Sequence, residues 1–148
     1  DMLGVEDIEF TGRVDVRDYL GKMDFTLLTS ISEGQPLTIL ESYAAHCPVI
    51  ATDVGNCREL IYGPTDSFGS AGILTHIMNL EEIAQAMIDL AQNKKLRDGM
   101  GEAGYKRVQA FYRIDRMKAV YKEIYQEFAE KQGQIWSEEP FDLELEQE

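Results

Sequence analysis

Short apolar segments of strand length alternate with helical segments along the first half of the chain. This alternation restricts the possible folds more than any other feature of the sequence. We expect buried strands at 25–30, 48–52 and 72–75, and a short strand that ends at a glycine at 8–12. Strands that alternate with helices favour a parallel sheet covered by helices on both faces. The sequence therefore predicts an α/β fold with a sheet of about four parallel strands.

The helices expected between these strands follow from apolar spacing and from helix end signals. Helices are predicted at 36–46 and 58–62, and Gly63-Pro64 closes the second of them. The first helix should pack against the sheet through one apolar stripe. The side chains expected to face the core are Leu37, Leu40 and Ala44.

The second half of the chain is expected to be helical up to residue 130. A capping box is predicted at 79–82, where the end residues bond each other's backbone amides. The apolar stripe after it comprises Leu80, Ile83, Ala84, Met87, Ile88 and Ala91. Amphipathic stretches at 96–111 and 117–128 are expected to pack against the core as well. We therefore predict one truncated α/β domain over residues 1–130, followed by an acidic, flexible tail at 131–148.

Charge and composition exclude several classes of protein. The chain carries a net charge of −13, whereas a nucleic-acid-binding protein would present the opposite sign. Its apolar stretches stay well short of the roughly 18 residues that indicate a membrane-spanning helix, and its first residues do not resemble a signal peptide. Cys47 and Cys57 have neither disulfide nor metal-ligand spacing, so buried free thiols are expected. We expect a cytoplasmic protein without a bound metal or cofactor, which reaches a membrane only through other subunits.

Two carboxylates, Glu33 and Glu41, flank the turn from the strand at 25–30 into the helix at 36–46. Pro36 suits the first helical position, where its missing N–H costs nothing. The amides that follow it form a helix N-terminus, which attracts anions through unpaired donors and the helix dipole. Glu41 lies about 7.5 Å further along the helix axis, where its carboxylate can accept hydrogen bonds from vicinal hydroxyl groups. This arrangement suits a sugar nucleotide; alternatively, Glu33 caps the helix and Glu41 is a solvated surface residue.

The residues around these carboxylates resemble the glycosyltransferases of the GT-B fold, in particular the retaining family 4, whose C-terminal domain carries the pattern E-x7-E. Here the pattern runs from Glu33 to Glu41 and continues into Pro48-Val49-Ile50-Ala51 and the loop at Gly55. The resemblance covers roughly residues 8 to 128. It implies a partial Rossmann-like C-terminal half of a GT-B fold, in an enzyme that transfers a hexose from a nucleotide sugar to a glycan or another acceptor.

A narrower likeness points to the transferases of Pel exopolysaccharide synthesis. It lies in the segments Cys57–Ile61 and Phe68–Gly72. We expect a UDP-hexose as the donor, and this narrower likeness implies that the hexose is glucose.

The family resemblance also implies roles for individual residues. By position, Glu33 is similar to the family glutamate that contacts the donor sugar, which implies a catalytic role, and Glu41 corresponds to the glutamate that binds the ribose. Backbone amides between them would face the phosphates. The donor-binding residues implied in this way are Glu33, Gly34, Gln35, Leu37, Thr38 and Glu41, with Gly55 on a donor-side loop.

Two positions depart from the family pattern. Many members have glycine where Pro36 stands, and a proline cannot donate a hydrogen bond to a phosphate. His46 stands where a glycine is usual at the C-terminal end of the helix. We expect His46 to be a left-handed cap or a surface residue, because histidine tolerates that backbone conformation better than most residues.

The family resemblance further implies that parts of the enzyme are missing. The family's C-terminal domain opens with a basic pair that grips the donor diphosphate, and an N-terminal domain holds the acceptor, but this chain starts after both. We therefore expect a fragment that is inactive alone and whose glycan acceptor binds through the missing domain. Two alternatives stay open: a non-catalytic interaction or regulatory domain that retains the sheet, and a GT-B domain of the sugar-nucleotide epimerase type. A Rossmann dehydrogenase is disfavoured, because no Gly-x-Gly-x-x-Gly follows a strand.

Overall fold

The structure is a computed structural model that describes residues 7–134. The chain divides into two compact units, Asp1–Gln109 and Ala110–Glu148. The predicted flexible tail lies, from residue 135 onward, outside the described residues.

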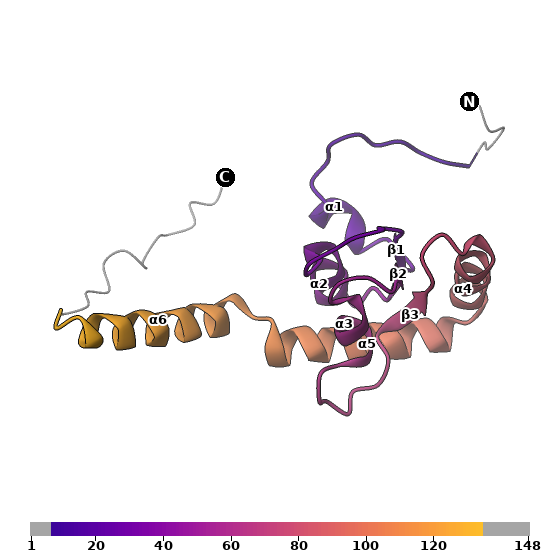
Figure 1. Cartoon of the computed structure of the whole chain (residues 1–148). Helices are drawn as coiled ribbons and strands as arrows, with labels where there is room; N and C mark the ends of the chain where they lie inside the picture. The colour runs from indigo at the N-terminus through magenta and orange to yellow at the C-terminus, as the bar shows by residue number, and fades with distance from the viewer. Residues whose placement is uncertain (1–6, 135–148) are drawn as a thin grey trace. The chain divides into compact units, whose positions relative to one another are not determined.

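The first unit is built on a sheet of three parallel strands in the order β1-β2-β3 (Figure 1). The strands are β1 (Thr26–Leu28), β2 (Val49–Thr52) and β3 (Gly72–Thr75). The helices are α1 (Arg17–Leu20), α2 (Leu37–Ala44), α3 (Cys57–Tyr62), α4 (Leu80–Gln92), α5 (Lys94–Phe111) and α6 (Ile114–Lys131). The predicted α/β fold with a helix-covered parallel sheet is confirmed.

The strand predicted at 8–12 is not formed, so the sheet has three strands and not about four. Ile8 is 55% exposed and Phe10 is 90% exposed. A strand is stabilised by hydrogen bonds to a neighbour and by burial of one face, and this segment obtains neither within residues 7–134. The alternation of apolar residues, used alone, therefore predicted one strand too many.

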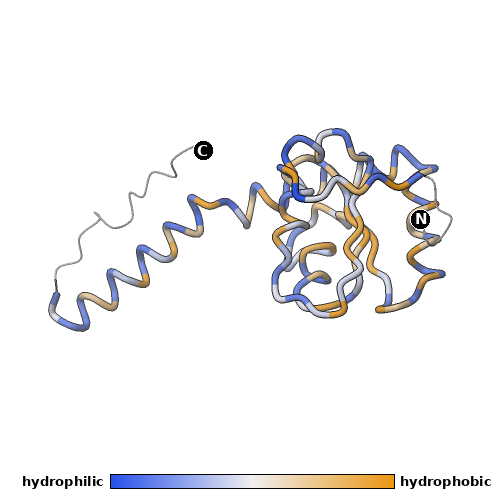
Figure 2. The backbone as a smooth tube through the Cα atoms, turned by 90° about the horizontal axis from the view of Figure 1, so that it is seen from above, coloured by the Kyte–Doolittle hydropathy of each residue, from blue (hydrophilic) through white to orange (hydrophobic). Residues whose placement is uncertain are grey.

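The core lies on both faces of β2, whose side chains alternate between two helical layers. Ile50 packs with Ala86 and Leu90 of α4 on one face. On the other face α2 and α3 contact the strand and bury Tyr43 and Leu60 completely. Figure 2 shows the hydrophobic segments converging on the strands in the centre of this unit. Helices thus cover the faces of the sheet, and the loops that follow the strands lie at its carboxyl edge.

The buried faces of two helices differ from those predicted. In α2, Leu37 is 67% exposed, Ala44 is also exposed and Leu40 is only half-buried, and in α4 Leu80 is 75% exposed. The side chains buried instead are Ile39, Ser42 and Tyr43 in α2, and Ile83, Ala86 and Leu90 in α4. Apolar residues on these helices cover more than one stripe, and the position of the sheet decides which stripe is buried.

A buried arginine ties α5 to the loop after α3. The Arg107 Nε donates to Asp66 Oδ2 at 2.7 Å, and Nη2 donates to Asp66 Oδ1 at 2.8 Å. Its Nη1 donates to the carbonyl oxygens of Leu60 at 3.0 Å and Ile61 at 2.9 Å. Both charged side chains are almost fully buried. Because every charge is paired, this network can persist in the interior, and it holds the C-terminal end of α3 in place.

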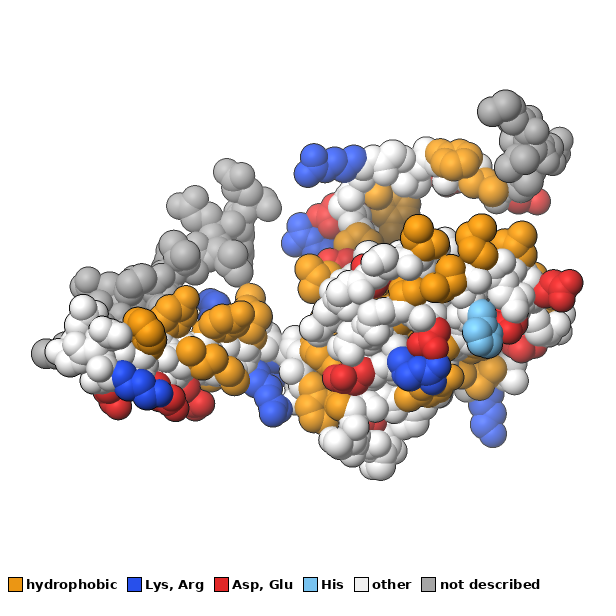
Figure 3. Space-filling model, in the orientation of Figure 1, with side chains coloured by type: hydrophobic (Ala, Val, Ile, Leu, Met, Phe, Trp, Pro, Cys, Tyr) orange, Lys and Arg blue, Asp and Glu red, His pale blue; other side chains and the backbone are white. Residues whose placement is uncertain are grey.

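In the second unit, the apolar stripe predicted at 117–128 lies along α6, and the other described residues of that unit leave it uncovered. Hydrophobic side chains gather along this helix in Figure 3. The exposed members are Ile114, Met117, Val120, Tyr121, Ile124, Tyr125 and Phe128. Across residues 7–134, none of the helices combines the length and apolar character that crossing a bilayer requires.

Candidate functional site

Glu33 lies in the loop that joins β1 to α2, and its carboxylate is oriented by the end of the neighbouring strand. The Ser30 hydroxyl donates to Glu33 Oε1 at 2.6 Å. The Thr52 hydroxyl, at the end of β2, donates in turn to the Ser30 carbonyl oxygen. Thr52 is buried, whereas Glu33 is half-buried. The strand therefore fixes the residue that positions the carboxylate.

The loop after β2 is seated directly against the Glu33 loop. Gly55 has a φ of +50°, and a Cβ placed there would lie 2.0 Å from the Glu33 carbonyl oxygen. The Asn56 amide donates to the Gly34 carbonyl oxygen at 2.9 Å. Only a glycine allows both this backbone conformation and this approach without strain. The family resemblance implies that Gly55 lies on a donor-side loop, and the structure brings this residue next to Glu33 and Gly34.

The N-terminus of α2 differs in one detail from the prediction. Pro36 has a ψ of 115° and is the residue before the helix, not its first helical residue. The helix begins at Leu37 without a side-chain cap. Leu37 and Thr38 are exposed, as are Gly34 and Gln35 before them. The first-turn amides of an uncapped helix are available to water or to an anion.

Glu41 lies on α2, at a cavity between that helix and α1. The cavity has a volume of about 660 Å³. Glu41 lines it together with Asp15, Val16, Arg17, Leu20, Gly21, Ala44 and Ala45. Its wall combines aliphatic side chains with one exposed carboxylate on α2. Concave sites of this size, apolar with a few polar groups, are typical of small-molecule binding.

An ion pair borders the same cavity. Arg17 Nε donates to Asp15 Oδ2 at 2.9 Å, and Nη2 donates to the same oxygen at 2.6 Å. These hydrogen bonds lower the pKa of Asp15 to about 2, so this carboxylate is charged at neutral pH. Neither residue was predicted from the sequence, because the cavity forms only when α1 folds against α2.

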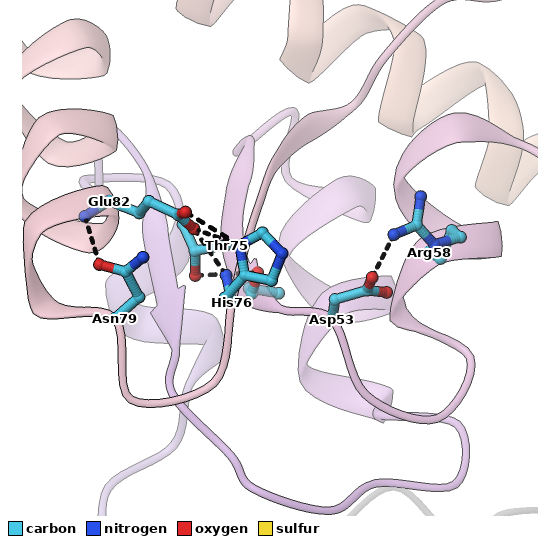
Figure 4. A network of polar contacts seen from close by, with 7 residues as sticks. Asp53, Arg58, Thr75, His76, Asn79 and Glu82 are labelled. Carbon is cyan, nitrogen blue, oxygen red and sulfur yellow. Dashed lines mark hydrogen bonds and ion pairs between the residues drawn. The ribbon is translucent and has the colours of Figure 1, made fainter.

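A second set of polar residues, which was not predicted from the sequence, lies at the carboxyl ends of β2 and β3 (Figure 4). Asp53, directly after β2, forms an ion pair with Arg58 of α3. His76, directly after β3, has its Nδ1 at 2.9 Å from both carboxylate oxygens of Glu82. The signal was present in the sequence, since residues that follow adjacent parallel strands meet at one edge of the sheet.

Glu82 also explains how the predicted capping box is realised. The Asn79 side chain accepts from the Glu82 amide at 3.2 Å, as predicted for the first residue of the box. The Glu82 carboxylate turns to His76 instead, and the His76 amide donates to it at 2.8 Å. The hydrogen bonds from the His76 amide and then from its ring lower the pKa of Glu82.

The remaining predicted residues behave as structural elements. His46 has a φ of 56°, and its ring stacks on Tyr105 with centroids 3.9 Å apart, which confirms the left-handed cap. Cys47 and Cys57 are buried free thiols, as expected, and burial raises the pKa of Cys47 to about 11. Among residues 7–134, no cluster of histidine, cysteine and carboxylate side chains is arranged to hold a metal ion.

Known proteins resemble this chain in both sequence and fold. Residues 1–93 match the family of glycosyl transferases group 1. The chain is 31% identical, over 137 residues, to N-acetyl-alpha-D-glucosaminyl L-malate synthase of Bacillus anthracis, an alignment that covers 90% of the chain and 35% of that protein. It is 32% identical, over 100 residues, to an uncharacterized glycosyltransferase of Methanocaldococcus jannaschii, which covers 66% of the chain and 27% of that protein.

The fold has a counterpart among solved structures. Sucrose-phosphate synthase from Thermosynechococcus elongatus superposes with a TM-score of 0.68 at 22% identity, over 79% of this chain and 30% of that chain. The chain thus spans about a third of the length of its matched relatives. The family match covers well over half of the chain and includes both Glu33 and Glu41. The chain therefore belongs to the group 1 glycosyl transferases, which have the GT-B fold.

Proposed function

We propose that this chain is the donor-binding part of a retaining glycosyltransferase that transfers a hexose from a UDP-hexose, in the first instance UDP-glucose, to a glycan acceptor. The observation that carries the proposal is the placement of Glu41 at the rim of a largely aliphatic cavity. Glu41 lies about one helical turn after the uncapped N-terminus of α2. These groups match the parts of a nucleotide: the carboxylate matches the ribose, the apolar wall matches the base, and the free amides match the diphosphate.

Each part of the donor has a corresponding group in this chain. The Glu41 carboxylate would accept hydrogen bonds from the ribose hydroxyls, and the base would lie on the wall formed by Val16 and Leu20. The amides of Leu37 and Thr38 would face the phosphates, where the helix dipole favours negative charge. Glu33, on the other side of the loop, would contact the sugar in the position that Ser30 imposes.

The proposed enzyme needs more than this chain. The acceptor would bind through an N-terminal domain, and the glycan would be an exopolysaccharide on the likeness to Pel transferases. The helix N-terminus contributes typically under about 1 kcal/mol at exposed sites. Each remaining hydrogen bond nets about 1 kcal/mol, against an association cost of at least about 4 kcal/mol. We expect the isolated chain to bind UDP-glucose at millimolar affinity at best and to transfer nothing.

Glu41→Ala tests the ribose role by titration of the 148-residue chain with UDP, followed through amide chemical shifts in a ¹H–¹⁵N correlation spectrum. Amides around α1 and the start of α2 should shift. Hydrogen bonds to a charged group contribute about 1.5–3 kcal/mol, so Glu41→Ala should weaken UDP binding roughly tenfold or more.

The matched control is Glu81→Ala, which removes an exposed glutamate from the first turn of α4 and should leave the UDP affinity unchanged. Equal UDP affinities for the parent chain and Glu41→Ala would reject the ribose role.

A non-catalytic interaction domain is the second candidate function. The apolar stripe of α6, which the other described residues of its own unit leave uncovered, favours it, because such a surface commonly marks a contact with another protein. UDP at millimolar concentration distinguishes the two: a specific shift pattern around Glu41 supports the donor site, and a spectrum that stays unchanged even at such concentrations supports the interaction domain.

A further inference from the structure

Thr52, the last residue of β2, is buried, and its hydroxyl links the sheet to the Glu33 loop. The hydroxyl donates to the carbonyl oxygen of Ser30, which follows the end of β1. Thr52 is 1% exposed, so a ligand does not reach it. The hydroxyl of Thr75, the last residue of β3, instead donates to the Ala51 carbonyl oxygen within the sheet. Of these two buried threonines at strand ends, Thr52 is the one that contacts the Glu33 loop.

The loop after β2 fixes the backbone of Glu33 independently of Thr52. Gly55 approaches the Glu33 carbonyl oxygen so closely that a Cβ on this glycine would lie 2.0 Å from it. The Asn56 amide donates to the Gly34 carbonyl oxygen at 2.9 Å. With the backbone held by these contacts, the freedom left to Glu33 lies in its side-chain torsions.

The direction of the Glu33 carboxylate depends on one hydrogen bond. The Ser30 hydroxyl donates to Glu33 Oε1 at 2.6 Å, and a serine hydroxyl has a single hydrogen to donate. Among residues 7–134, no other group donates to this carboxylate, so Oε2 is available to a hydroxyl group of a ligand. Thr52 therefore holds the backbone of Ser30, and Ser30 holds the carboxylate.

Loss of the Thr52 hydroxyl would displace Ser30. An O–H···O hydrogen bond keeps its two oxygens about 2.7–2.8 Å apart, whereas a carbon atom stays about 3.3–3.6 Å from a carbonyl oxygen. In Thr52→Val the Ser30 carbonyl oxygen must therefore retreat by about 0.5–0.9 Å. This movement carries the Ser30 hydroxyl away from the position in which it donates to Glu33.

We propose that Thr52 is a positioning residue for the donor sugar, which acts through Ser30 on the carboxylate of Glu33. This inference rests on the proposed function for the sugar as the ligand of Glu33. Each side-chain torsion that is freed has three staggered wells. Apparent affinity falls in proportion to the population of the productive conformation, so contact with the sugar weakens about threefold for one freed torsion and about ninefold for two.

Titration of the 148-residue chain with UDP and with UDP-glucose, at millimolar concentrations in ¹H–¹⁵N spectra, measures this effect. The readout is the Kd for UDP-glucose divided by the Kd for UDP, because comparing both ligands in every variant cancels their different charges. Thr52→Val should raise this ratio about three- to ninefold and leave the Kd for UDP unchanged. Thr52→Ser keeps the hydroxyl and should retain the parent ratio.

Thr75→Val is the matched control. It removes a buried hydroxyl at the end of the neighbouring strand, whose bond stays within the sheet, and should retain the parent ratio. Three-bond couplings that report the side-chain torsions of Glu33, measured without ligand, give a second readout. They should show one rotamer in the parent and in Thr75→Val, and averaging over rotamers in Thr52→Val.

The outcomes separate this inference from the donor site. If both ligands shift the α2 amides but the ratio is unchanged in Thr52→Val, or rises equally in Thr75→Val, the inference is overturned and the donor site stands. If neither ligand shifts any amide, the donor site has failed and the couplings decide: averaging in Thr52→Val alone supports the positioning of Glu33, and equal couplings in both variants overturn it. Should Thr52→Val not fold, Thr52→Ala removes the same hydroxyl without the close methyl contact, and the same outcomes apply to it.

Discussion

Gly55→Ala probes the contact that joins the loop after β2 to the Glu33 loop. The new methyl group would meet the Glu33 carbonyl oxygen at 2.0 Å, so one of the two loops must move. Alanine in a left-handed conformation costs about 1–2 kcal/mol, and overpacking adds about 1–3 kcal/mol. We expect the free energy of unfolding to fall by about 2–5 kcal/mol, and the amides of Glu33 and Gly34 to shift in the folded protein.

Urea denaturation followed by circular dichroism measures this loss. Gly69→Ala is the matched control, because Gly69 also has a positive φ, +94°, but no atom lies within 4 Å of the added Cβ. It should show the backbone cost alone. If Gly69→Ala destabilises the chain as much as Gly55→Ala does, and the Glu33 amide keeps its chemical shift, the contact between the two loops does not hold the site together.

Three further predictions address the proposed catalytic residue and the buried ion pair. In a protein that joins this chain to an acceptor-binding domain, Glu33→Gln should reduce kcat far more than UDP affinity; poor UDP binding with normal turnover at saturation would contradict its place beside the sugar. Arg107→Ala should lower the free energy of unfolding in urea by about 3–5 kcal/mol, because it leaves Asp66 charged and buried. Arg17→Ala, which removes an exposed ion pair, should leave the free energy of unfolding almost unchanged. Hydrogen bonds from Arg107 lower the pKa of Asp66 in the folded protein. The stability that they confer is therefore present above the pKa of Asp66 in the unfolded chain, about 4, and is lost as the pH falls through the lower folded pKa. An Asp66→Asn variant that loses stability in acid as steeply as the parent would refute this assignment.

The sequence alone determined the class of fold and the position of the turn between β1 and α2. The apolar runs at 25–30, 48–52 and 72–75, the capping residue Asn79 and the closing residue Gly63 are local signals, and the structure contains these elements where the signals stand. His46 was predicted as a left-handed cap or a surface residue, and its φ of 56° shows the left-handed conformation. The conformation of one residue depends mainly on its own side chain and its immediate neighbours.

Tertiary structure decided the burial of each face and the surroundings of the candidate site. The 8–12 segment has strand-like alternation but forms no strand, and α2 buries Ile39 and Tyr43 where the pattern predicted Leu37. The cavity beside Glu41 and the hydrogen bond from Thr52 to Ser30 each require segments that are distant in sequence to meet. Such contacts depend on packing between elements, and the periodicity within one element constrains that packing only weakly.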